Sequence, residues 1–133
     1  MATKKDVITV EDILRRKDFF KEKDNRTQEL YVSSLDADII IKKPSKELLL
    51  ESSEMDDDVE ANSFLVYECI KTPDLHSPAL HEMFKDKIKE PWDIVYEVFD
   101  VMEVSDIADM LIDLSGRGGV KSISDSMTEE IKK

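Results

Sequence analysis

The sequence is poor in the residues that usually build catalytic and metal sites. Its 133 positions contain one cysteine, two histidines, one tryptophan and 7% aromatic residues. Cys69 cannot form an intrachain disulfide by itself, and one thiol with two histidines cannot complete a four-ligand zinc site. These shortages exclude a disulfide scaffold and a structural zinc fold, and we expect no cofactor.

Long apolar runs and excess positive charge are also missing. No stretch approaches eighteen consecutive apolar residues, and Asp6 and Glu11 interrupt the N-terminus before an apolar leader could form. The 31 acidic and 19 basic side chains give a formal net charge of −12, which opposes binding to phosphates and anionic membranes. We therefore expect a cytoplasmic protein whose partners are neither nucleic acid nor membrane.

The negative charge is unevenly distributed. Residues 1–28 carry eight basic and six acidic side chains, a net charge of +2, so residues 29–133 carry −14. From Glu47 to Glu68 there are eight carboxylates and no lysine or arginine. Asp56–Glu60 lacks the alternating ligands and the turn glycine of an EF-hand calcium loop. The pattern predicts a solvated acidic surface.

Hydrophobic periodicity predicts an α+β fold that is mainly α, with a β-hairpin followed by a compact bundle of about four to five short helices. We expect an N-terminal arm over residues 1–28, with a short helix capped by Thr9 and a charged connector. The body covers residues 29–116, and residues 117–133 form a polar tail. Within the body we expect a hairpin over 29–43 and helices over about 45–54, 58–71, 77–86, 91–102 and 105–115.

The last two helices have the most regular pattern. Ser105 is predicted to cap the final helix, and Gly116 to provide its left-handed stop. The predicted buried positions are spaced as on one helical face, at Ile94, Val95, Val98, Phe99 and Met102, and then at Ile107, Met110, Leu111 and Leu114. This spacing predicts that Met102 and Met110 belong to the core.

No pattern indicates an active site, and we expect a protein that is not an enzyme. His76 and His81 are five residues apart, which does not place two ligands on one helical face. Cys69 lies between apolar neighbours and is predicted to be a small core residue. The glycine cluster at residues 116–119 follows a predicted helix, so it cannot present backbone N–H groups at a helix N-terminus to a phosphate.

The order of features resembles a known family. Ile8–Leu14 reads ITVEDIL, residues 66–84 read VYECIKTPDLHSPALHEMF, residues 92–99 read WDIVYEVF, and the last predicted helix ends Leu114-Ser115-Gly116. This series is similar to the XkdN-like tail assembly chaperones of long-tailed phages and PBSX-type prophages of Gram-positive bacteria. The likeness extends from about Ile8 to Gly116. The segment Val101–Val104 departs from it, retaining only the Glu of the family's usual Pro-Gly-Glu linker.

The resemblance implies a non-catalytic protein of the host cytoplasm that binds the tape measure protein before the tail tube assembles. It would be absent from the finished particle. The major tail tube protein and a second copy of the chain are further candidate partners. We expect the partner surface near the Ser-x-x-Leu-x-x-x-Phe motif, at Leu75, Leu80, Met83, Phe84 and Trp92. Lys132-Lys133 could be encoded by a slippery run that yields a longer frameshifted product.

A second hypothesis comes from charge alone. A small acidic inhibitor could mimic DNA and block a nuclease or a DNA-binding enzyme. Such a protein needs carboxylates spaced along one exposed face like phosphates, and its binding should weaken with salt. The basic-free stretch from Glu47 to Glu68 is the feature that suggests it.

Overall fold

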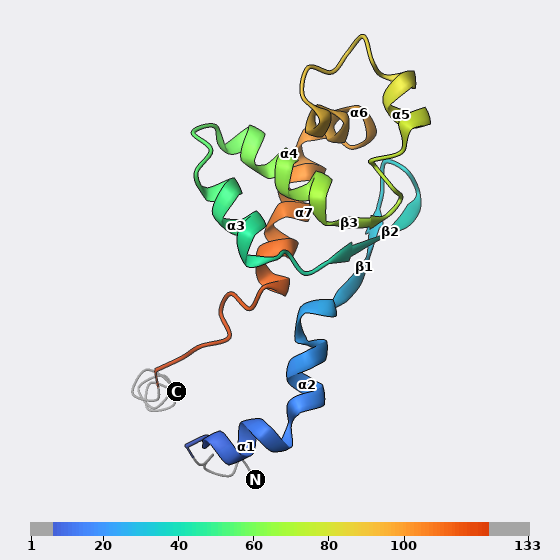
Figure 1. The fold of residues 1–133 in the computed structure, drawn as a ribbon. Helices are drawn as coiled ribbons and strands as arrows, with labels where there is room; N and C mark the ends of the chain where they lie inside the picture. Colours follow the sequence, from blue (N-terminus) through green and yellow to red (C-terminus); the bar gives the residue numbers. More distant parts are fainter. Residues whose placement is uncertain (1–6, 123–133) are drawn as a thin grey trace, which may run out of the picture.

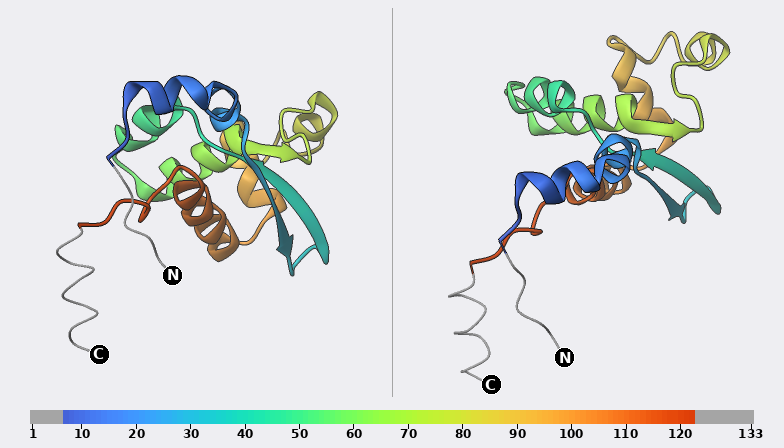
Figure 2. Two further views of the ribbon diagram at one scale, coloured as in Figure 1. Left: turned by 90° about the horizontal axis from the view of Figure 1, so that it is seen from below. Right: turned by 60° about the horizontal axis from the view of Figure 1, so that its bottom comes forward.

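The computed structural model describes residues 7–122, which form a helical arm attached to a mixed body (Figures 1 and 2). The elements in chain order are α1 (Val10–Arg15), α2 (Lys17–Glu22), η1 (Lys23–Asn25), β1 (Thr27–Val32), β2 (Ala37–Lys42), α3 (Lys46–Ser53), α4 (Asp58–Cys69), β3 (Ile70–Thr72), α5 (Pro78–Met83), η2 (Pro91–Ile94), α6 (Val95–Val98) and α7 (Val101–Leu114). The α+β class with predominant helix is confirmed.

The three strands form one antiparallel sheet in the order β1-β2-β3. β1 and β2 are rich in β-branched and aromatic residues and pair from Thr27 with Lys42 to Val32 with Ala37. The turn between them contains Asp36 with a positive φ of 46°, and its carboxylate accepts a 2.6 Å hydrogen bond from the Tyr31 hydroxyl. β1 lies at the edge of the sheet, so one side of its backbone has no strand partner within the described chain.

The prediction of a helix over 58–71 is wrong at its end. α4 stops at Cys69, and residues 70–72 form β3 alongside Ile40 and Ile41 of β2. The sequence pattern did not reveal this strand, because its partner lies some thirty residues away. Ile70 is buried by the pairing, and tertiary contact therefore overrides local helical periodicity.

α4 is the centre of the core. Asp57 caps its start by accepting a hydrogen bond from the Val59 amide at 3.0 Å. Its second half is buried almost all round, and it contacts α3, η2, α6 and α7 (Figure 1). The core includes Val32, Ile39 and Ile41 from the sheet, Leu65, Val66 and Cys69 from α4, Ile94, Val95 and Phe99, and Val104, Ile107 and Leu111 from α7.

The boundary between the last two helices was predicted in the wrong place. Phe99 is extended, with φ −119° and ψ 155°, and α7 begins at Val101 instead of 105. Asp100 and Glu103 form a capping box, which is the start signal of α7. Ser105 is therefore inside α7 and is not a cap. Residues 91–98 form η2 and α6, each only four residues long.

Two predicted core methionines are exposed instead. The buried residues of α7 are Val104, Ile107, Ala108 and Leu111, whereas Met102 is 70% and Met110 41% exposed. Met102 follows the break at Phe99 and so does not continue the face of Ile94 to Phe99, and Met110 lies beside the buried stripe of α7. The prediction that they are core residues is wrong.

Two further segments differ from expectation, the charged connector and the helix predicted over residues 77–86. The charged connector contains α2 and η1, and the arm ends at Arg26 because Thr27 already begins β1. The helix predicted over 77–86 extends only from Pro78 to Met83, although Ser77 caps it as expected. Gly116 has the predicted left-handed conformation, with φ 105°. Residues 123–133, which include Lys132-Lys133 and most of the predicted tail, lie outside the described part.

Candidate functional site

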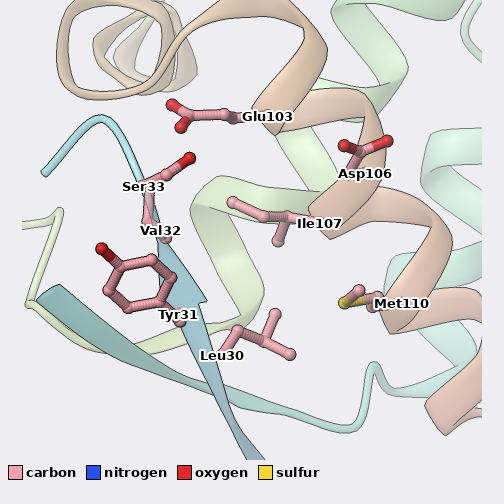
Figure 3. A pocket seen from close by; sticks show the side chains of 8 residues that line it. All are labelled: Leu30, Tyr31, Val32, Ser33, Glu103, Asp106, Ile107 and Met110. Atoms are coloured by element: carbon pink, nitrogen blue, oxygen red, sulfur yellow. The ribbon is translucent and has the colours of Figure 1, made fainter. Parts of the chain in front are cut away.

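A groove separates the free edge of β1 from α7 (Figure 3). It has a volume of about 200 Å³ and is lined by Leu30, Tyr31, Val32, Ser33, Glu103, Asp106, Ile107 and Met110. We call it the β1–α7 groove. Its volume is below the roughly 300–1,000 Å³ typical of pockets for small molecules, so it is better suited to side chains of another polypeptide.

Hydrogen bonds across the groove hold its two walls together. The Glu103 carboxylate accepts from the Ser34 hydroxyl at 2.7 Å, from the Ser34 amide at 3.2 Å and from the Asp100 amide at 3.0 Å. The bond from the Asp100 backbone, followed by those from Ser34, holds the pKa of the Glu103 carboxyl below its ordinary value. One side chain thus caps α7 and ties it to the turn that follows β1.

The floor and rim of the groove differ in character. Leu30 and Ile107 provide an apolar floor that belongs to the core or packs against it. The rim carries two exposed apolar side chains, Tyr31 of β1 and Met110 of α7. Leu35, Val101 and Met102 are also exposed, in the turn and on α7, but they do not line the groove. Methionine is flexible and polarisable, so such a rim can adapt to varied apolar surfaces. Acidic residues Asp106, Asp109 and Asp113 accompany it on the exposed side of α7.

A second unusual surface lies on the N-terminal arm. Neither α1 nor α2 contains a buried residue. The exposed apolar side chains are Val7, Ile8, Val10, Ile13, Leu14 and Phe19. An arm of this composition leaves apolar area in water that a folded monomer ordinarily covers.

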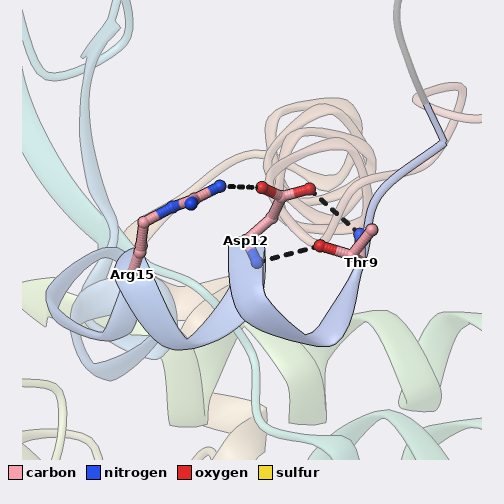
Figure 4. A network of polar contacts seen from close by, with 3 residues as sticks. All are labelled: Thr9, Asp12 and Arg15. Carbon is pink, nitrogen blue, oxygen red and sulfur yellow. Dashed lines mark hydrogen bonds and ion pairs between the residues drawn. The ribbon is translucent and has the colours of Figure 1, made fainter.

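The arm helix is nevertheless well formed locally (Figure 4). The Thr9 hydroxyl accepts a hydrogen bond from the Asp12 amide at 3.2 Å, and the Asp12 carboxylate accepts from the Thr9 amide at 3.0 Å and pairs with Arg15. These contacts, first of all the one from the Thr9 backbone, lower the pKa of Asp12. The Arg16 guanidinium lies 4.7 Å from the centre of the Phe19 ring, within cation–π range.

The residues predicted to bind a partner are only partly available. Leu75 is 1% exposed and belongs to the core. Leu80, Phe84 and Trp92 are half-buried and pack against the core, and only Met83, at 73%, is fully presented to solvent. Trp92 meets Phe64 edge to face at 5.5 Å, and its indole N–H is buried without a hydrogen-bond partner. None of these five residues lines the β1–α7 groove.

The two histidines gather around Tyr67. The His76 ring stacks on Tyr67 at 4.1 Å, and His81 Nε2 lies 2.8 Å from the Leu75 carbonyl oxygen and 3.3 Å from the Tyr67 hydroxyl. A ring nitrogen this close to a carbonyl must donate its proton there, so it cannot also accept one as a base. Burial, and then Glu68 and Asp74, raise the pKa of Tyr67. The cluster fastens α5 to α4.

Cys69 and the carboxylates from Glu47 to Glu60 are the remaining candidates for a catalytic or metal site, and their surroundings do not favour either role. Burial raises the pKa of the Cys69 thiol to about 12, which leaves very little thiolate at neutral pH. The carboxylates from Glu47 to Glu60 are all exposed. Among residues 7–122, no three histidine, cysteine, aspartate or glutamate side chains come close enough to hold a metal ion.

A second hollow lies where the arm joins the body. It is about 410 Å³ in volume and is lined by Asp24, Lys43, Pro44, Ser45, Lys46, Glu47, Leu49 and Ser115. Lys43 Nζ lies 3.4 Å from the Asp24 carboxylate in this region. Charges of both signs line it, so its electrostatics favour no particular class of ligand.

The sequence contains one signal for the start of α7, the helix that forms one wall of the β1–α7 groove. Asp100 and Glu103 stand three apart before an apolar helix, which is the capping-box pattern. A helix that starts there does not continue the face of Ile94 to Phe99, so Met102 leaves the predicted core stripe. None of the helices between residues 7 and 122 combines the length and the apolar character that crossing a bilayer requires.

No protein-family model, curated protein or solved structure matches the chain.

Proposed function

We propose that the protein is a tail assembly chaperone that holds apolar helical segments of a tape measure protein in the β1–α7 groove. The observation that carries this proposal is the groove itself, with an apolar floor, the exposed side chain of Met110 at its rim, and acidic neighbours. An amphipathic helix can place its apolar stripe in such a groove. The resemblance of residues 8–116 to XkdN-like chaperones supplies the identity of the partner.

The acidic body suits this role in two ways. Like charge keeps a concentrated binding protein soluble and limits random association. Carboxylates at the rim, such as Asp106 and Asp109, accelerate the approach of a basic partner more than they strengthen the final complex. We propose that the complex forms in the cytoplasm of the bacterial host, requires no cofactor or catalysis, and releases the tape measure protein as tail tube subunits arrive.

Coexpression tests the proposal. The tape measure protein should be soluble and should copurify when this chain is present, and should precipitate when it is absent. Met110→Asp, at the rim of the groove, should reduce copurification by at least about tenfold, because a charge is placed in an apolar contact. The matched control is Met83→Asp, an exposed methionine on α5 that should leave copurification intact.

Comparing Met83→Asp with Met110→Asp also shows whether the partner binds around α5 and η2 or in the β1–α7 groove. Loss of binding in Met83→Asp but not in Met110→Asp would move the partner site to α5 and η2, as the sequence suggested. A tape measure protein that stays equally insoluble with and without the chain would contradict the proposal. If the chain instead displaced DNA from a nuclease in a salt-dependent way, it would be a DNA mimic.

A further inference from the structure

The chain presents two separate apolar surfaces to solvent. One is the arm, with Ile13 and Leu14 on α1 and the exposed residues Val7 and Ile8 before it. The other is the β1–α7 groove with its methionine rim. Covering either would remove apolar area from water, at roughly 25 cal/mol per Å². A single partner segment of the right charge could cover the groove.

The charges of the two surfaces are complementary. Residues 1–28 are net positive within a chain of charge −12, and Arg15, Arg16 and Lys17 are consecutive at the end of α1. The exposed side of α7 carries Asp106, Asp109 and Asp113, and Glu103 stands at the groove wall. The net-positive arm thus fits the acidic β1–α7 groove in the sign of its charge as well as in apolar character.

The two surfaces lie at opposite ends of β1 within one chain. The arm joins β1 at Thr27, whereas the groove is lined by the other end of the strand, from Leu30 to Ser33. The arm extends away from the body beyond the start of β1 (Figure 1). In this arrangement a chain does not cover its own groove, but a second chain can reach it.

We propose that the N-terminal arm of one copy docks into the β1–α7 groove of a second copy. Ile13 and Leu14 contact the floor and the methionine rim, and Arg15–Lys17 face the carboxylates of α7. Residues 7–9, which precede α1 and of which Thr9 is extended, lie next to the free edge of β1, whose backbone groups can pair with them. Reciprocal exchange of arms closes a symmetric dimer with two equal contacts.

The contact does not require that the groove also bind a tape measure protein. If the groove does bind a tape measure protein, the arm and the tape measure helix compete for the same surface. Arm exchange would then cover the groove while no tape measure protein is present. The test below uses the purified full chain alone, so its outcome is independent of the proposed function.

Mass measurement by light scattering or sedimentation, as a function of concentration, tests the proposal with three variants. The arm variant is Ile13→Asp with Leu14→Asp, and the groove variant is Met110→Asp. Val120→Asp is the control, since Val120 is exposed and lies in neither surface. Circular dichroism checks that each variant retains the fold. The wild type and the control should dimerise, and each test variant should dimerise at least about tenfold more weakly.

Mixing the arm variant with the groove variant is the decisive step. The first retains an intact groove and the second an intact arm, so a one-to-one heterodimer should form through a single contact, more weakly than the wild-type dimer. Raising the salt concentration should weaken association further. A wild type that stays monomeric throughout, test variants that dimerise like the wild type, or a mixture that fails to associate would each overturn the proposal.

Discussion

Helices α1 and α7 begin with the same device but lead to opposite environments. Thr9 and Asp12 form a capping box at α1, and Asp100 and Glu103 form one at α7. α7 buries four residues against the core, and its cap also binds Ser34 across the chain, whereas α1 buries none. Local sequence signals can thus start a helix in either place, but only packing makes the helix part of the cooperative structure.

Truncating matched leucines should expose this difference most strongly. Leu111 on α7 is 0% exposed and Leu14 on α1 is 67% exposed. Leu111→Ala should lower the free energy of unfolding by about 2–5 kcal/mol, because it leaves a cavity in the core. Leu14→Ala should change it by less than about 0.5 kcal/mol. Urea unfolding of the monomer, followed by circular dichroism, measures both; equal losses would mean that the arm packs on the body.

The next largest difference in stability is expected between the variants Tyr96→Phe and Tyr31→Phe. The Tyr96 hydroxyl donates to the Val59 carbonyl at 2.8 Å and joins α6 to the first turn of α4. Tyr96→Phe should destabilise the body by about 0.5–1.5 kcal/mol, since the bond is lost. Tyr31→Phe removes the bond to Asp36 within an exposed turn and should cost less. Urea unfolding compares the two, and a larger loss for Tyr31 would show that the turn contributes more than the α4–α6 contact.

Acid should act on the body through Glu103. Its pKa is lower in the folded protein than the ordinary 4.5, so its contribution to stability is fully present above that value and is lost as the pH falls through the folded pKa. Glu103→Gln keeps a cap-forming side chain and removes this titration. Unfolding measured from pH 6 to pH 3 should therefore depend less on pH in the variant. A dependence of stability on pH that is the same in Glu103→Gln and the wild type would contradict the prediction. Ser34→Ala tests the other side of the hydrogen bond between Ser34 and Glu103.

Substitution of Thr9, which caps α1 in the arm, is expected to change the stability of the whole protein least. Thr9→Ala removes the acceptor of the Asp12 amide and should destabilise α1 locally by about 0.5–2 kcal/mol. Amide hydrogen exchange should become faster from Asp12 to Arg15, while the unfolding midpoint of the body stays unchanged. A shifted midpoint would show that arm and body unfold together.

The sequence was sufficient for the parts of the fold that local patterns determine. The strands around Tyr31 and Ile40, the cap of α5 at Ser77 and the stop at Gly116 each depend on residue types next to one another in the chain. The α+β class follows from these. β3 could not be found in this way, since Ile70 becomes part of a strand only when β2 lies beside it.

The candidate site was predicted less well, for a related reason. The groove exists because the edge of β1 faces α7, a juxtaposition of residues about seventy positions apart. Periodicity identified an apolar stripe on the last helix but started the helix four residues late, which assigned Met102 to the preceding helix and its core face. Met110 was assigned to the core by its spacing from Ile107, although it lies beside the buried stripe. Leu75 was expected at the partner surface, but it belongs to the core, and its burial depends on the packing of elements distant in the chain.

The position of the single tryptophan has a practical consequence. Trp92 packs edge to face on Phe64 between η2 and α4, and no aromatic residue of the arm contacts it. Its fluorescence therefore reports on the interior of the body and is silent toward fraying of α1. A tryptophan placed at Phe19 would supply the missing optical signal for the arm, so that the same chain could report its two regions separately.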